Sequence, residues 1–289
     1  LFSLSGNQIL SVYDATLGRG IAIVHTRHEA AAVHMADAWG RLTERAGVAL
    51  VTAGPGHMNA LSALYGALMA ESPVVLLSGA SPRAQAGRGA FQEMDQVAAA
   101  RPVTKAAWLA ADAARLGEDV ARALAIAESG RPGPVHVSLP GDLLEARVDG
   151  PAGAPVAGAR AAAEAMPADS QIAEALALLA DAKRPLILLG PATARPLRRA
   201  AVERFSRLTG IPALPMESPR GTNDPWLHGA AARLADADVV LLLGKKLDFA
   251  VKFGEPPAFA PACRFIQVDA GTAALRQRGA GALALAGEP

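Results

Sequence analysis

The segment VALVTAGPGHMN, residues 48–59, decides the fold class of this chain. Its first four residues form an unbroken apolar run that stops shortly before a Gly-Pro-Gly sequence. A strand buried on both faces loses the alternation of polar and apolar side chains, so the run is typical of a parallel strand in an α/β fold. Gly54 and Gly56 lack Cβ atoms and allow the backbone to approach a flat ligand, while Pro55 stiffens the turn.

Comparable apolar runs recur along the chain, with Ala-rich segments of helical spacing between them. The runs cover residues 21–24, 74–77, 135–139, 186–189, 239–243 and 265–268. The helical segments cover residues 30–42, 59–70, 116–127 and 172–179. This alternation predicts an α/β fold with two three-layer domains, each a mainly parallel sheet flanked by helices.

Residues 151–167, PAGAPVAGARAAAEAMP, separate the two halves of the pattern. They contain no strand run and carry proline at intervals, which indicates a linker. We therefore expect one domain over residues 1–150 and a second, Rossmann-like domain over residues 168–289. The run from Leu1 into the turn at Gly6 predicts that the sequence is a fragment at its front.

The composition gives no general reason to expect a charged polymer as partner. Lys and Arg number 28 against 27 Asp and Glu, for a net charge of +1, so we expect neither nucleic acid nor an anionic membrane as partner. No apolar run reaches the roughly 18 residues that span a bilayer. Cys263 is the only cysteine, which excludes an internal disulfide and suits a cytoplasmic protein. We expect Cys263 to be a small buried residue rather than a nucleophile.

His28, Glu29 and His34 superficially suggest a zinc-binding helix. However, an H-E-x-x-H site needs its second imidazole four residues after the first, and position 32 is Ala32. The two histidines are six residues apart and do not share a helix face. We therefore expect no metal ligands in this chain.

The segment IAIVHTRHEAAA, residues 21–32, predicts a buried strand that leads into a helix. Glu29 would then lie at the carboxyl end of a parallel strand, where open α/β sheets bind ligands. Its small apolar neighbours predict poor hydration, which suits a carboxyl group for proton exchange. The alternative is that Glu29 only complements the helix macrodipole in a first helical turn.

Two further motifs complete a specific order. AFQEMD occupies residues 90–95, and SGRPGPVHVSLP occupies residues 129–140. The succession R-H-E-x-A-A, T-x-G-P-G-x-x-N, F-Q-E-x-D and S-G-R-P-G-P-V resembles the pyrimidine-binding domain of thiamine-diphosphate-dependent enzymes. The nearest group resembles acetolactate synthase, with 2-hydroxyacyl-CoA lyase, oxalyl-CoA decarboxylase and benzoylformate decarboxylase alongside. The likeness covers nearly all of the first domain.

The resemblance implies a role for each matching residue. Glu29 would hydrogen-bond N1′ of the cofactor's aminopyrimidine and favour the imino tautomer, which removes the C2 proton of the thiazolium; the ylid then attacks a 2-keto acid. The implied cofactor contacts are Leu4, Glu29, Pro55, Asn59 and Gln92, and the implied substrate pocket comprises His28, Phe91 and Gln92. For Asn59 the alternative is an ordinary polar residue in a first helical turn.

The second half resembles the middle domain of the same enzymes, which holds FAD in some relatives, ADP or CoA in others, and is structural in many. Pro191, in LGPAT at residues 189–193, removes a backbone donor that a phosphate could use. The sequence therefore favours a middle domain without FAD or ADP. Asp269 could contact a ribose, although a strand-end cap is the favoured reading.

The family's third domain holds the diphosphate through Mg²⁺ with a Gly-Asp-Gly element, and the 289 residues contain none. We expect that domain elsewhere in the gene product or on another subunit, and this chain alone to be inactive. The family shares its active site between chains, which implies a dimer or tetramer. Three functions remain open: a 2-keto acid decarboxylase or carboligase resembling acetolactate synthase, an acyl-CoA enzyme resembling 2-hydroxyacyl-CoA lyase or oxalyl-CoA decarboxylase, and a non-catalytic nucleotide- or CoA-binding subunit.

Overall fold

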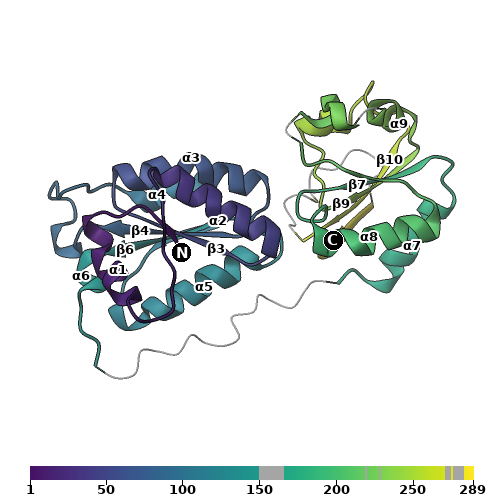
Figure 1. Ribbon diagram of the computed structural model, residues 1–289. Coiled ribbons are helices and arrows are strands. Elements are labelled where there is room, and N and C mark those ends of the chain that lie inside the picture. Colours follow the sequence, from purple (N-terminus) through teal and green to yellow (C-terminus); the bar gives the residue numbers. More distant parts are fainter. Residues whose placement is uncertain (150–165, 219, 228, 271–274, 276–282) are drawn as a thin grey trace. The chain divides into compact units, whose positions relative to one another are not determined.

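The computed structural model describes residues 1–149, 166–218, 220–227, 229–270, 275 and 283–289. The chain divides into two compact units, residues 1–161 and 162–289. Each unit has one parallel sheet with helices on its faces, as Figure 1 shows. The predicted α/β fold class is therefore confirmed. The expected linker, residues 151–167, lies outside the described residues except for Met166 and Pro167.

The first unit contains a six-stranded sheet in the order β2-β1-β3-β4-β6-β5. Its strands are β1 (Phe2–Ser3), β2 (Val24–His25), β3 (Gly47–Val51), β4 (Val74–Ala80), β5 (Ala106–Leu109) and β6 (Val135–Pro140). Every pairing between neighbours is parallel. The carboxyl ends of these strands therefore meet along one edge of the sheet, where ligands bind in folds of this class.

Helices cover both faces of this sheet. They are α1 (Leu10–Thr16), α2 (Glu29–Thr43), α3 (Pro55–Met69), α4 (Gln96–Ala100), α5 (Leu116–Glu128) and α6 (Gly141–Leu144), with short 3₁₀ segments η1 (Asn7–Ile9), η2 (Arg83–Gln85), η3 (Arg101–Val103) and η4 (Ala113–Arg115). α2 and α3 pack on one face and α5 on the other, which gives three layers (Figure 1).

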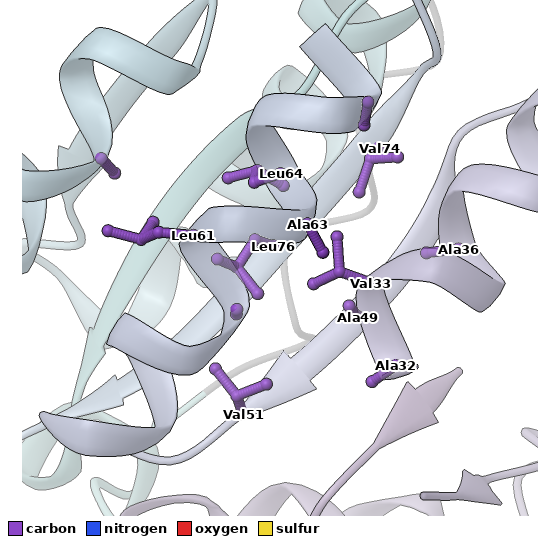
Figure 2. Close-up of a cluster of buried hydrophobic side chains, with 13 residues drawn as sticks. Ala32, Val33, Ala36, Ala49, Val51, Leu61, Ala63, Leu64, Val74 and Leu76 are labelled. Carbon is purple, nitrogen blue, oxygen red and sulfur yellow. The ribbon is translucent and has the colours of Figure 1, made fainter. Parts of the chain in front are cut away.

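The core beneath α2 and α3 is built largely from small side chains. Figure 2 shows Val33 and Ala36 of α2 and Ala63 of α3 beside Ala49 and Leu76 of the sheet. All five are at most 2% exposed. Because alanine occupies so little volume, the two helices can approach the sheet and each other closely.

Gly47 marks the closest of these approaches and gives a direct test of the packing. A Cβ atom at this position would lie 2.1 Å from the carbonyl oxygen of Ala36. We expect Gly47→Ala to lower the free energy of unfolding by about 2–3 kcal/mol, because two backbone segments must separate. Gly66→Ala is the control: it adds a methyl group to α3 in open space and should stabilise by about 0.5–1 kcal/mol. Urea unfolding measures both free energies. Equal midpoints for the two variants would contradict the close approach of Gly47 to Ala36.

The second unit contains a five-stranded parallel sheet in the order β11-β10-β9-β7-β8. Its strands are β7 (Pro185–Leu189), β8 (Ala213–Pro215), β9 (Val239–Leu243), β10 (Arg264–Asp269) and β11 (Leu283–Ala286). α7 (Asp169–Ala180) and α8 (Pro196–Thr209) pack on one face. α9 (Ala230–Asp236) and η7 (Phe249–Gly254) pack on the other, with η5 (Gly221–Asn223) and η6 (Pro225–Leu227) nearby in sequence.

The prediction of a buried strand over residues 21–24 is wrong. Only Val24 and His25 pair with β1, and they form the edge of the sheet. Val24 in this two-residue edge strand is 43% exposed, and Ile21, which precedes the strand, is 52% exposed. The strands β5 and β11 were not predicted, and α3 begins at Pro55 rather than at residue 59.

Candidate functional site

Glu29 occupies the first position of α2, immediately beyond β2. The preceding residue, His28, caps the helix: its Nδ1 accepts a hydrogen bond from the Ala30 N–H at 3.1 Å. This capping satisfies a backbone donor and fixes where the helix begins. The Glu29 side chain is 8% exposed, whereas His28 is exposed. The carboxylate is therefore largely sheltered from water at the carboxyl edge of the sheet.

Asn59 and the Gly-Pro-Gly turn flank this carboxylate. Asn59 Nδ2 donates to Glu29 Oε2 at 3.0 Å, and no other donor to the Glu29 carboxylate occurs within the described ranges. A Cβ atom on Gly56 would lie 3.1 Å from Oε1. Gly56 is therefore the residue that lets the backbone lie this close to the carboxylate. Pro55 is the first residue of α3 and is exposed, where its fixed φ suits a helix start.

The loop after β4 closes another side of the Gly-Pro-Gly turn. Gln92 has a φ of +60°, an uncommon backbone conformation for a residue other than glycine. It lies against Gly54, since a Cβ atom added there would be 2.9 Å from both the Cβ and the carbonyl oxygen of Gln92. The neighbouring Phe91 side chain is 69% exposed. Leu4 is half-buried and follows β1 directly.

The sequence reasoning missed Gln8 and Thr52, which join these segments. Thr52 Oγ1 donates to Gln8 Oε1 at 2.6 Å, and Gln8 Nε2 donates to the Phe91 carbonyl oxygen at 3.4 Å. The segments after β1, β3 and β4 are thereby connected. Thr52 lies inside the T-x-G-P-G motif, so its position was a usable signal, whereas Gln8 lies in no motif.

Glu93 holds the loop that carries Gln92. Its carboxylate accepts hydrogen bonds from the backbone N–H groups of Gly87, Gly89 and Ala90. These bonds, that of Gly87 first, lower the pKa of Glu93 from its ordinary value. The charged form of Glu93 is thus the one that organises the loop.

We expect Glu93→Ala to release this loop without disturbing the sheet. Tryptic cleavage after Arg88, which lies between the glycines that Glu93 binds, should become several-fold faster because the backbone loses its acceptor. Limited proteolysis followed by mass spectrometry measures the rate. Glu118→Ala, in the first turn of α5, is the control and should leave this cleavage unchanged. Equal rates in the Glu93 variant and the parent would show that the carboxylate does not hold the loop.

A pair of buried histidines lies in the core near the site. His57, which follows Gly56, and His136 on β6 are both fully buried, and their ring centroids are 4.5 Å apart. His57 Nδ1 forms a hydrogen bond with Ser78 Oγ at 2.9 Å. Burial lowers the pKa of His57 to about 4, an effect that the Gln96 backbone partly offsets. Burial, and then the neighbouring His57, lower the pKa of His136 well below its ordinary value.

Comparison with known families matches both units. Residues 1–99 match the N-terminal TPP binding domain of thiamine pyrophosphate enzymes, and residues 172–289 match the central domain of these enzymes. The chain belongs to the thiamine pyrophosphate enzyme family. Thiamine pyrophosphate is the same compound as thiamine diphosphate, so the resemblance stated from the motifs is confirmed.

Individual relatives of this chain carry the names of different activities. Oxalyl-CoA decarboxylase of Escherichia coli is 34% identical over 288 residues, with 93% of this chain and 49% of the relative covered. 2-Hydroxyacyl-CoA lyase of Oryza sativa is also 34% identical, over 284 residues with the same coverages. A probable acetolactate synthase of Mycobacterium bovis is 36% identical over 259 residues, covering 88% of this chain and 47% of the relative. The chain spans about half the length of these relatives.

Neither a metal centre nor a reactive thiol is evident in the part of the chain that the structure describes. Within the described ranges there is no group of three or more His, Cys, Asp or Glu residues that could hold a metal ion. Cys263 is buried, as expected, and burial raises the pKa of its thiol to about 11. No helix in the described part of the chain is long and apolar enough to cross a membrane.

In the second unit the strand ends are tightly apposed. A Cβ atom on Gly190, at the end of β7, would lie 2.3 Å from the carbonyl oxygen of Gly244 at the end of β9. Asp269, the last residue of β10, is 1% exposed. These positions lie at the carboxyl edge of the second sheet, where Pro191 follows Gly190.

Proposed function

We propose that this chain forms the aminopyrimidine-activating part of a thiamine-diphosphate-dependent decarboxylase, lyase or carboligase, with Glu29 as its catalytic residue. The observation that carries the proposal is the burial of the Glu29 carboxylate together with its hydrogen bonding. The carboxylate is buried, Asn59 binds one oxygen, and the other lies beside Gly56 with no protein donor in the described residues. This second oxygen can accept a hydrogen bond from the N–H group of a bound ring.

The residues of the site fit the cofactor's aminopyrimidine. When bound, thiamine diphosphate supplies a thiazolium that accepts electrons from the substrate carbon. Glu29 Oε1 would hold a proton at N1′ of the pyrimidine, and Asn59 would keep Oε2 in place. Gly54 and Gly56 would allow the ring to lie against the backbone, where a side chain would clash. We further propose that Leu4, Pro55 and Gln92 contact the ring.

The names of the relatives point to two classes of substrate. Those with CoA in their names support an acyl-CoA substrate, and the acetolactate synthase supports a 2-keto acid. We propose His28, Phe91 and Gln92 for the substrate side of the site, because His28 precedes Glu29 and is exposed, Phe91 is exposed, and Gln92 lies against Gly54. A non-catalytic nucleotide- or CoA-binding subunit is less favoured, since such a protein would have no use for a buried Glu29 carboxylate that Asn59 holds by a hydrogen bond.

The remainder of the complete protein belongs to the same proposal. We propose that a diphosphate-binding domain outside these residues holds Mg²⁺, and that two or four chains assemble in the cytoplasm with shared active sites. Neither FAD nor ADP is proposed for the middle domain, because Pro191 removes a backbone donor at the turn where a phosphate would bind.

Calorimetric titration of the complete protein tests this function. Thiamine diphosphate with Mg²⁺ should bind, and assays with pyruvate, oxalyl-CoA and a 2-hydroxyacyl-CoA should reveal turnover of one substrate class. Absence of cofactor binding would contradict the proposal. Binding of ADP, FAD or CoA without thiamine diphosphate would instead support the non-catalytic alternative.

A further inference from the structure

Gln96 is a buried amide beside the Gly-Pro-Gly turn. It is the first residue of α4 and is 3% exposed. Its Oε1 accepts a hydrogen bond from the Gly54 N–H at 2.9 Å. Its Nε2 donates to the Gly79 carbonyl oxygen at 3.0 Å and to Ser138 Oγ at 2.8 Å. One side chain therefore connects the carboxyl ends of β3, β4 and β6.

The bond to Gly54 is made at the start of α3. Gly54 is the N-cap residue of this helix, has a φ of +58° and offers no side chain to cap it. Gly54 is buried, and a buried backbone N–H without an acceptor is costly. Gln96 supplies the acceptor and so favours the turn geometry that Gly54 adopts.

The same turn leads directly to the groups around Glu29. Gly56, two residues further, lies beside Glu29 Oε1, since a Cβ atom there would be 3.1 Å from it, and Asn59 in the same first stretch of α3 binds Oε2. A shift of the turn would therefore change the space beside the carboxylate and the hydrogen bond that orients it. Small displacements of this kind weaken binding to a preorganised site.

We propose that Gln96 is a positioning residue, which acts through Gly54 to hold the Gly-Pro-Gly turn at the spacing from Glu29 that a flat heterocycle requires. We call the hydrogen bond from the Gly54 N–H to Gln96 Oε1 the clamp. The clamp is observed in the structure, whereas its benefit for the cofactor rests on the proposed function. A Gln96 that only filled the core would affect stability and leave the turn and the cofactor affinity unchanged.

Amide hydrogen exchange of the complete protein without cofactor tests the clamp. Gln96→Met keeps an unbranched side chain but removes the acceptor, so exchange over residues 53–57 should rise by about tenfold while residues 47–51 of β3 stay protected. Gln96→Glu keeps an oxygen within reach of the Gly54 N–H and should retain more protection than Gln96→Met. Equal exchange in the parent and both variants would overturn the clamp.

Titration of the same proteins with thiamine diphosphate and Mg²⁺ tests the consequence. Gln96→Met should raise the Kd by about tenfold, equal to about 1.4 kcal/mol. Gln267→Met, which removes a buried amide from β10 of the other sheet, is the control and should leave the Kd within about twofold. An unchanged Kd in Gln96→Met, with the turn loosened, would overturn the positioning role. If the parent protein itself binds no thiamine diphosphate, the proposed function fails, and the exchange result still decides the clamp.

Discussion

Replacement of Glu29 by glutamine is expected to lower turnover by the complete enzyme by about 10²–10⁴-fold, the usual contribution of a positioned proton-transfer group. The amide has nearly the shape of the carboxylate and can still accept a hydrogen bond from Asn59 through its oxygen. It cannot exchange a proton with a ring nitrogen. Steady-state kinetics at saturating thiamine diphosphate measures the loss, and circular dichroism should show an unchanged fold.

Glu118→Gln is the matched control for this experiment. Glu118 also lies in the first turn of a helix, α5, where it interacts with the macrodipole and pairs with Arg115 at 2.9 Å. If Glu29 only complemented its own helix, the two variants would behave alike. We expect full turnover from Glu118→Gln. Near-normal kcat in Glu29→Gln would remove Glu29 from the mechanism.

Acid is expected to destabilise the first unit through the buried histidine pair. The folded state disfavours protonation of His57, since burial lowers its pKa from 6.5 to about 4. The unfolded chain binds this proton more readily, so stability is complete above about pH 6.5 and is lost as the pH falls toward 4. For His57 alone the loss is about 3 kcal/mol. His136, whose pKa is also lowered, adds to the loss.

Urea unfolding at a series of pH values from 7.5 to about 4 measures this dependence. His57→Gln removes one titrating group, so its stability should vary less with pH over the same range, although it should be lower at neutral pH. His34→Gln, on the exposed face of α2, is the control and should follow the parent protein. A parent whose stability does not fall between pH 6.5 and 4 would contradict the buried, neutral state of the pair.

The strands that the sequence predicted correctly lie in the interior of the two sheets. Val48–Val51 and Val239–Leu243 are apolar without interruption because both faces are covered, and this leaves a clear signal. The edge strands have no such signal. Ala106–Leu109 in β5 contains no β-branched residue and is only half-buried, and β2 has too few residues to show a pattern.

The site could be predicted to the extent that its residues lie in ordered motifs. Glu29, Asn59 and the Gly-Pro-Gly turn belong to such motifs, and the structure brings these three together. Gln96 could not be found in this way, because an amide next to a motif carries no distinctive chemistry until its partners are known. His136 was visible within a strand, but its contact with His57 joins residues 79 positions apart and depends on the sheet order.

The most direct test of the role of Glu29 is a crystal structure of the complete protein with thiamine diphosphate and Mg²⁺. We expect Glu29 Oε1 to lie about 2.6–3.2 Å from N1′ of the aminopyrimidine, as a hydrogen bond requires, with the ring against Gly54 and Gly56. A pyrimidine bound elsewhere, with the Glu29 carboxylate bonded only to protein or solvent, would contradict this role.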